Sequence, residues 1–295
     1  MNKKRAAWMI VRDDWWYVDM AIECVIDHVD GIFILDTGST DKTMEVVTDL
    51  RHLYGGRLIV VEQKDFGVPR RFGPGWFDRW VEKDARNYSM FKALEIWKPN
   101  WLIQIDADEV YNDRYWEILE TVEKTYLTFG HSTTMFSSST RASDFSADKR
   151  GMGGKMLFDP HIRSWSAKLP IEWVQPPHAH AHLSVKMGDK YIGLPEDFVT
   201  EDHVHFHLHR SFGPKSLHTF FTTGLGWDGA AEKLGIPIEK IFDQDQYEKK
   251  FPQNFTDGKF CPPKEAVENK LAYSIPLTHP LPKYTLKRWK DWGIW

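Results

Sequence analysis

Short apolar runs alternate with amphipathic stretches over the first 110 residues of the chain. Four runs are short, mostly apolar and bounded by charged or turn-forming residues, which predicts buried strands at 7–11, 31–35, 57–62 and 101–105. Between these runs apolar residues recur every three or four positions, which predicts helices at 18–29, about 41–53 and 78–97. Strands that alternate with helices imply right-handed crossovers and a parallel sheet, so the predicted fold class is α/β.

Three of these strands lead directly into acidic residues. Asp13 follows the first strand, Asp36 the second, and Asp106 and Asp108 the fourth. Ligands of open α/β sheets bind outside the carboxyl ends of the strands, so Asp13 and Asp36 are expected to line one pocket. Two carboxylates separated by one residue point the same way from an extended segment, which lets Asp106 and Asp108 share an Mg²⁺ or Mn²⁺ ion that holds a diphosphate. The alternative is that these aspartates are solvated turns or helix caps.

A run of histidines lies near residue 205, where His203, His205, His207 and His209 alternate with other residues. Alternation places all four side chains on one face of a strand. Imidazole is a common metal ligand, and four histidines on one face are unusual for a core. The alternative is that two or three of them only cover a surface strand.

Composition and charge narrow the class of protein. A chain of 295 residues is long enough for one large α/β domain, or for a domain with an appendage. Its formal net charge of −4 argues against a general nucleic-acid coat protein. Only Cys24 and Cys261 occur, so no disulfide framework is expected and a cytoplasmic location fits best. The first apolar run stops at Arg12 and no other reaches membrane-spanning length, which predicts a soluble protein with no transmembrane segment.

Four motifs follow one another in the first part of the chain. They are Met9-Ile-Val-Arg-Asp-Asp14, Val29-Asp-Gly-Ile-Phe-Ile-Leu-Asp-Thr-Gly-Ser-Thr-Asp-Lys-Thr43, Ala85-Arg-Asn87 and Ile105-Asp-Ala-Asp-Glu109. In this order they resemble the motifs of family-2 glycosyltransferases of the GT-A fold. The resemblance covers about the first 110 residues, and four motifs in order are a far more specific signal than any one of them.

The resemblance implies roles for individual residues. In the family, the end of the first strand and the aspartate before Thr-Gly-Ser-Thr hold the nucleotide base and ribose, which points to Asp13 and Asp36. The arginine ahead of the metal strand also approaches the base, and Arg86 matches it. The Asp-x-Asp motif implies a place near the ribose for Asp106 and a place on the metal for Asp108.

The resemblance also implies a late metal ligand and a general base. A histidine late in the domain completes the metal shell in the family, which favours His207 and then His205. Inverting members often carry an acidic pair ahead of that strand, and here Glu196, Asp197, Glu201 and Asp202 precede it. Asp202 is the first choice for the base that takes the proton of the acceptor, and Glu201 is the second.

The chain departs from the family pattern in two places. Arg12-Asp13-Asp14 stands where the family usually has Lys-Asn-Glu, which keeps the charge pattern but leaves the exact base contact open. His178 is followed by Ala179, whereas relatives often show a His-Glu pair at such a position. The role of that glutamate is therefore not transferred to any residue of this chain.

The sequence predicts that the chain is divided into a domain and a smaller extension. Residues 1–210 are expected to form a GT-A, Rossmann-like domain with a mixed, mostly parallel sheet flanked by helices. Beyond 211 repeated prolines interrupt the chain, a turn is predicted at 224–229 and a helix at 238–251, so 211–295 is interpreted as a small helical or irregular extension that packs on the core. Its basic and aromatic end fits either docking on the core or clamping of a polymer.

These features predict a metal-dependent glycosyltransferase with Mn²⁺ or Mg²⁺ as its cofactor. It would move one sugar from a nucleotide-diphosphate donor, with a UDP-sugar favoured over a GDP-sugar, and the family-2 resemblance implies a single displacement with inversion. The acceptor stays open among glycan, protein, small molecule and modified nucleic acid. Two alternatives remain, a nucleotidyltransferase that uses the same metal pocket and a non-catalytic sugar- or nucleotide-binding module.

Overall fold

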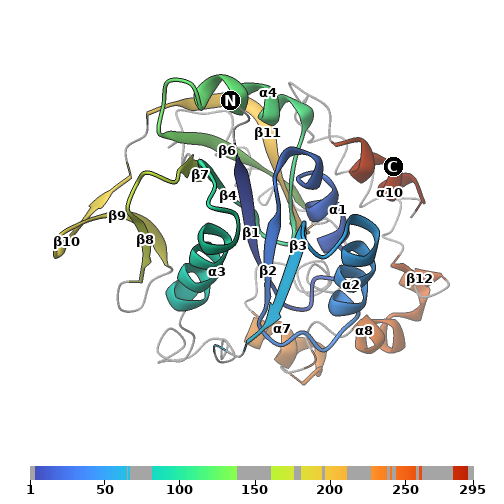
Figure 1. Ribbon diagram of the computed structural model, residues 1–295. Coiled ribbons are helices and arrows are strands. Elements are labelled where there is room, and N and C mark those ends of the chain that lie inside the picture. The colour runs from blue at the N-terminus through green and yellow to red at the C-terminus, as the bar shows by residue number, and fades with distance from the viewer. Residues whose placement is uncertain are drawn as a thin grey trace.

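An eight-stranded mixed sheet forms the centre of the computed structural model (Figure 1). The structure describes residues 4–64, 66, 82–137, 161–175, 181–194, 197–210, 227–237, 240, 244–256, 259–260 and 282–291. Across the sheet the strands are β3 (Ile59–Gln63), β2 (Ile32–Asp36), β1 (Arg5–Val11), β4 (Trp101–Gln104), β7 (His161–Ser166), β6 (Thr128–Ser137), β11 (Val199–Arg210) and β5 (Glu109–Tyr111). The β3–β2, β2–β1, β1–β4 and β6–β11 pairs are parallel, and β7 and β5 pair antiparallel with their neighbours.

Helices cover both faces of the sheet (Figure 1). Alternate residues of β1 point to opposite faces, so Met9 belongs to one buried core and Trp8 to the other. Helices α1 (Val18–Glu23), α2 (Thr43–Tyr54) and α4 (Asp113–Val122) contribute to the first core, and α3 (Glu82–Trp97) contributes to the second. This arrangement confirms the predicted class, a mixed and mostly parallel α/β sheet flanked by helices.

The first helix is shorter than its sequence pattern predicts. The pattern indicates a helix over 18–29, but α1 ends at Glu23 and a single 3₁₀ turn, η1, follows at Ile26–His28. Cys24, Val25 and Ile26 are all buried. Burial does not mark this boundary, because α1 itself buries the consecutive residues Val18 to Ile22. The Val25 N–H donates to the Ile22 carbonyl, which is the tighter bonding of a 3₁₀ turn.

A separate three-stranded antiparallel sheet stands beside α3 (Figure 1). Its strands are β8 (Ile171–Val174), β9 (His182–Met187) and β10 (Lys190–Gly193). The Asn87 side chain of α3 donates to the Trp173 carbonyl at 2.9 Å and accepts from the Trp173 N–H at 2.8 Å. One asparagine thus takes the place of a strand neighbour for β8 and fixes the small sheet against α3.

Short elements follow β11 in the described part of the chain. They are α7 (Trp227–Leu234), α8 (Gln244–Lys250), η4 (Pro252–Asn254), β12 (Phe255–Thr256), β13 (Lys259–Phe260) and α10 (Lys283–Asp291). The prediction of a turn over 224–229 is wrong from Trp227 onward, where α7 begins. Part of the helix predicted at 238–251 is present as α8, and residues 238–239 and 241–243 lie outside the described residues. The division of the chain at residue 210 stays a prediction.

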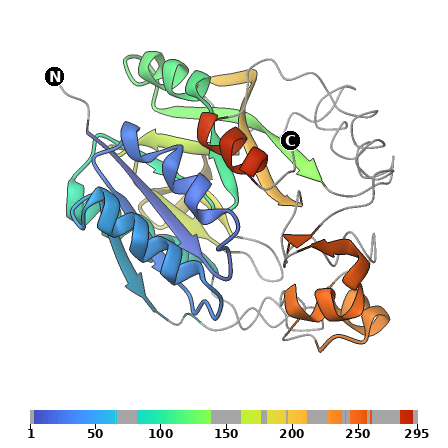
Figure 2. The same cartoon turned by 90° about the vertical axis from the view of Figure 1, so that its right-hand side faces the viewer.

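The last helix, α10, packs against α1 (Figure 2). Arg288 Nε lies 2.7 Å from Asp19 Oδ2, and Tyr284 and Leu286 pack on the first core. Burial raises the pKa of Asp19, although the charge of Arg288 opposes this effect. Helix α10 therefore docks on the sheet domain through an ion pair and apolar contacts. None of the helices in the described ranges is long and apolar enough to cross a membrane.

The buried thiol of Cys24 gives a test of the core between α1 and β5. Cys24 Sγ accepts a hydrogen bond from the Tyr111 N–H at 3.3 Å, and burial raises the pKa of the thiol to about 12. Because a raised pKa keeps the thiol protonated, we expect no reaction of Cys24 with Ellman's reagent between pH 7 and 9 until the protein unfolds. The measurement uses a Cys261→Ser background, in which Cys24 is the remaining cysteine. Complete reaction within minutes in the native state would contradict this packing.

Candidate active site

The acidic residues at the carboxyl ends of β1, β2 and β4 lie at the same end of the sheet. In the parallel β1–β2 pair, Val11 is opposite Asp36, so the two strands end side by side. Strand β4 lies on the other flank of β1, and the Ile105 N–H donates to the Trp8 carbonyl at 3.2 Å, immediately before Asp106. The carboxyl ends of three neighbouring strands thus carry Asp13, Asp36 and Asp106, where open α/β sheets bind their ligands.

Asp13 and Asp36 both hold the turn that follows β2. Asp13 has a φ of 53°, in the left-handed region that aspartate visits more readily than most residues, and its Oδ1 accepts from the Thr40 N–H at 2.7 Å. Asp36 is fully buried, and its Oδ1 accepts from the Ser39 N–H and hydroxyl at 3.0 and 2.6 Å. Its Oδ2 accepts from Gln63 at 3.0 Å. These are contacts of turn residues, which the sequence also allowed, and contact with a nucleotide stays a prediction for both.

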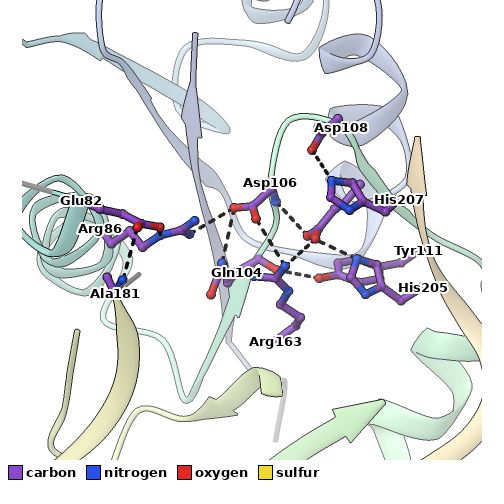
Figure 3. A network of polar contacts seen from close by, with 11 residues as sticks. Glu82, Arg86, Gln104, Asp106, Asp108, Tyr111, Arg163, Ala181, His205 and His207 are labelled. Atoms are coloured by element: carbon purple, nitrogen blue, oxygen red, sulfur yellow. Dashed lines mark hydrogen bonds and ion pairs between the residues drawn. The ribbon is translucent and has the colours of Figure 1, made fainter. Parts of the chain in front are cut away.

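Five side chains form a line of alternating charge along the end of β4 (Figure 3). Arg86 of α3 donates to Glu82 at 2.8 Å and, through Nη1, to Asp106 Oδ1 at 3.2 Å. Arg163 of β7 donates from Nη2 to Asp106 Oδ2 at 3.3 Å and also to Glu109 Oε1. Each oxygen of Asp106 therefore faces a different guanidinium, and each guanidinium has a second carboxylate behind it.

Two more side chains hold the guanidinium groups in place. The Arg86 guanidinium lies 4.6 Å from the ring centroid of Trp173, within the range of a cation–π contact. The Gln104 amide oxygen, in the orientation that satisfies its neighbours, accepts from Arg86 at 2.8 Å and from Arg163. The arginines are thus fixed both along and across the line of charges.

Glu109 is the most deeply buried carboxylate of the group, with 1% of its side chain exposed. Its Oε2 accepts from the Asp106 N–H at 3.1 Å and lies 3.2 Å from His205 Nε2. Burial raises the pKa of Glu109, but the charges of Arg163 and His205 outweigh burial and hold it well below its ordinary value. Burial lowers the pKa of His205 despite Glu109. The contact with Arg163 thus favours the ionised form of Glu109.

Asp108 and His207 form a second pair beside this line. Their Oδ1 and Nε2 atoms lie 3.1 Å apart, and 14% and 23% of the two side chains are exposed. In the antiparallel β11–β5 pair His207 is opposite Glu109, which places its ring next to Asp108 (Figure 3). Burial lowers the pKa of His207, but Asp108 outweighs this effect and the pKa lies above its ordinary value. The structure thus joins Asp108 to His207, whereas His205 contacts Glu109 instead.

The Asp108–His207 pair fits part of the coordination sphere of a divalent cation. Their separation of 3.1 Å is that of a direct ion pair, and it is also close to the spacing of two neighbouring ligands on one octahedral cation. Mg²⁺ usually keeps several waters and is bound through one or two carboxylates together with substrate phosphates. Over the described ranges no three His, Cys, Asp or Glu side chains come together as a metal-holding group. A cation held by this pair would therefore complete its shell with oxygen atoms of water and substrate.

The predicted general base lies elsewhere on β11. Asp202 Oδ2 accepts from Arg114 Nε of α4 at 3.1 Å. In the β11–β5 pair, His207 lies opposite Glu109 and His205 lies opposite Tyr111, so the step from His207 to His205 leads away from Asp108. Asp202 lies further along β11 in that direction. The structure therefore does not place Asp202 beside Asp106 or Asp108. The side chain of Glu201 lies outside the described residues, as do those of His203 and His209.

Sequence reasoning assigned no role to Glu109 or Arg163. Glu109 directly follows Asp108 in the sequence, so its place beside the Asp-x-Asp motif could have identified it as a candidate site residue. Arg163 is 54 residues further along the chain than Glu109. It reaches the site because β7 pairs antiparallel with β4, with Ser164 opposite Ile103. No local spacing marks it, so only the tertiary fold identifies this arginine.

Comparison with known proteins finds weak likenesses of shape. No protein-family model and no curated protein matches the chain. TarS from S. aureus in complex with UDP matches over 45% of this chain and 36% of its own, with 13% identity and a TM-score of 0.34. TarS 1–349 matches over 86% and 74%, with 10% identity and a TM-score of 0.41. A likeness at this level carries no argument about function.

A third match is of the same kind. It is the glucosyl-3-phosphoglycerate synthase from Mycobacterium tuberculosis in complex with Mn²⁺, UDP and glucosyl-3-phosphoglycerate. The match covers 57% of this chain and 58% of that one, with 16% identity and a TM-score of 0.33. The first and third matches thus span less than two thirds of the length of the proteins concerned.

Proposed function

We propose that this protein is a metal-dependent glycosyltransferase that takes a sugar from a nucleotide-diphosphate donor. The observation that carries the proposal is the contact between Asp108 and His207 beside the Asp106 carboxylate, at the carboxyl ends of parallel strands. A pair that binds a cation suits the diphosphate of such a donor, and the carboxylate beside it, at the carboxyl ends of the strands, suits the ribose. The four ordered sequence motifs support the same assignment.

In this proposal each side chain has a separate task. Asp108 and His207 would hold a Mn²⁺ or Mg²⁺ ion, which when bound would neutralise the diphosphate charge that grows as the glycosidic bond breaks. Asp106, held between Arg86 and Arg163, would present its carboxylate to the ribose hydroxyls. Asp13, Asp36 and Arg86 are proposed for the base and ribose, and contact with Asp36 requires that it exchange one of its present hydrogen bonds.

Transfer with inversion needs one base and one direct displacement. The acceptor oxygen forms its bond to the anomeric carbon as the bond from that carbon to the diphosphate oxygen breaks. The acceptor proton passes to a carboxylate within hydrogen-bond reach. Asp202 and then Glu201 remain the proposals from sequence, although the Arg114 contact and the distance along β11 count against Asp202. The acceptor, as glycan, protein, small molecule or modified nucleic acid, is left open.

Nucleotide-dependent stabilisation tests the donor site directly. A ligand at about 100 times its Kd stabilises a protein by about 2.7 kcal/mol, which raises the Tm of a domain of this size by about 5 °C. We expect UDP with Mn²⁺ to give such a shift, and UDP with EDTA or Mn²⁺ alone to give much less. GDP and Mg²⁺ form parallel arms that name the base and the metal. A panel in which no nucleotide shifts the Tm under any metal would overturn the proposal.

The second candidate function is a sugar- or nucleotide-binding module without turnover. The feature that favours it is Ala179, which follows His178 where relatives often carry glutamate. A module would bind the nucleotide through Asp108 but leave the donor intact. A nucleotidyltransferase would use the same pair to release diphosphate from a nucleoside triphosphate. Product analysis therefore separates the three, because only the glycosyltransferase releases a nucleoside diphosphate from its sugar.

A further inference from the structure

Arg163 is a buried cation that reaches the candidate site from a strand with no predicted part in it. Only 13% of its side chain is exposed, and its Nη2 contacts Asp106 Oδ2 at 3.3 Å as well as Glu109 Oε1. Removing a charge of this kind from water is costly unless carboxylates surround it. Its two carboxylates lie on the same short segment, on either side of Asp108.

The contacts around Arg163 close into a ring. From Asp106 Oδ2 the ring passes to Arg163, then to Glu109 Oε1, and returns from Glu109 Oε2 to the Asp106 N–H at 3.1 Å. Both the carboxylate and the backbone of Asp106 are therefore fixed by the same pair of residues. His205 supports Glu109 from behind at 3.2 Å. Asp106, which the proposed function assigns to the ribose, is thus held at both its carboxylate and its backbone N–H.

We propose that Arg163 is a positioning residue for the nucleotide donor, acting through Asp106 and anchored by Glu109. The inference rests on the proposed function, since Asp106 needs a donor to present its carboxylate to. A guanidinium suits the task because its Nη2 donates to both carboxylates while its Nη1 donates to the Gln104 amide oxygen, so three partners fix one rigid plane. The ammonium of lysine is a point charge on a flexible stem, so the substitution Arg163→Lys would keep the charge and lose this fixed geometry.

The test compares two arginines that are both largely buried and paired with carboxylates. Arg5 at the start of β1 contacts Glu123 through Nε at 2.6 Å and Nη2 at 3.1 Å, and only 10% of its side chain is exposed. It lies at the opposite end of β1 from the candidate site. Arg163→Lys and Arg5→Lys thus each replace a buried arginine that is paired with carboxylate, two carboxylates for Arg163 and one for Arg5. Thermal unfolding of both variants measures the general loss of stability separately from nucleotide binding.

Calorimetric titration with UDP in the presence of Mn²⁺ gives the readout. We expect Arg163→Lys to weaken binding by about tenfold or more, as the loss of an outer partner commonly does, and Arg5→Lys to leave the affinity unchanged. Arg163→Lys added to Asp106→Asn should cost less than about threefold more, because a residue that acts through Asp106 has nothing left to position.

The outcomes distinguish failure of the proposed function from failure of the inference about Arg163. Wild-type protein that binds neither UDP nor GDP would overturn the proposed function and this inference with it. Wild type that binds, together with Arg163→Lys that binds equally well, would overturn the inference alone. An equal loss in the wild-type and Asp106→Asn backgrounds would show that Arg163 does not act through Asp106. Should Arg163→Lys not fold, Arg163→Met with Glu109→Gln removes both buried charges together and carries the same expectations.

Discussion

Replacing Asp108 by asparagine is expected to abolish metal-dependent nucleotide binding while the fold remains intact. The substitution removes the anionic oxygen that lies 3.1 Å from His207 and leaves one imidazole to hold a cation. Loss of even an outer partner of a metal ligand costs about 10- to 100-fold in metal affinity, so loss of the carboxylate itself should cost at least about 100-fold. Titration of Mn²⁺ and UDP into the variant measures the effect.

The control for this experiment is Asp189→Asn. Asp189 is exposed in the turn between β9 and β10, so its replacement removes one negative charge without touching the site. It should bind UDP and Mn²⁺ as wild type does, and both variants should show the far-ultraviolet circular dichroism of the wild type. Metal-dependent binding that survives in Asp108→Asn would remove Asp108 from the site.

Replacing Glu109 by glutamine is expected to destabilise the protein by about 3 kcal/mol, the lower end of the range for breaking a buried ion pair, because buried Arg163 loses one of its two carboxylates. Arg163 would keep only Asp106 at 3.3 Å, and the Asp106 N–H would lose a charged acceptor. The lowered pKa of Glu109 means that its stabilisation is present above its ordinary value of 4.5 and is lost as the pH falls through the lowered value. Urea unfolding at pH 7 and in acid measures both effects.

The matched change is Glu117→Gln on α4. Glu117 also pairs with an arginine, Arg114, at 3.1 Å, but 65% of its side chain is exposed. An exposed pair of this kind contributes about 0 to 1 kcal/mol, so the variant should unfold close to wild type. If Glu109→Gln lost less than about 1 kcal/mol at pH 7, the buried charges would not be coupled as the contacts indicate.

The parallel half of the sheet is predictable from sequence because its strands are buried on both faces. Such strands are continuous apolar runs, and the runs at 7–11, 31–35 and 101–105 correspond to β1, β2 and β4. The mixed half is harder, because β7 and β6 carry polar residues such as Ser164 and His131 that are nonetheless fully buried. Their burial depends on neighbours that are distant in the sequence, so local patterns do not report it.

The candidate site divides in the same way. Acidic residues at strand ends are visible in the sequence, since the position of a strand fixes where its carboxyl end lies. Their ion pairs are not visible, because the resemblance implies a contact of Arg86 with the base and not with Asp106, and assigns no role to Arg163. Alternation predicts that His205 and His207 share a face, yet residues two apart on a strand are about 7 Å apart, and each meets a different carboxylate.

The proposed function requires the chain to cleave a nucleotide-sugar bond at the Asp108–His207 pair. The most direct measurement is release of nucleoside diphosphate from a panel of UDP- and GDP-sugars with Mn²⁺ and no acceptor, for wild type and Asp108→Asn. We expect slow release from one donor by the wild type, none with EDTA, and none by the variant. A donor that binds tightly and stays intact through prolonged incubation would contradict it and identify a binding module instead.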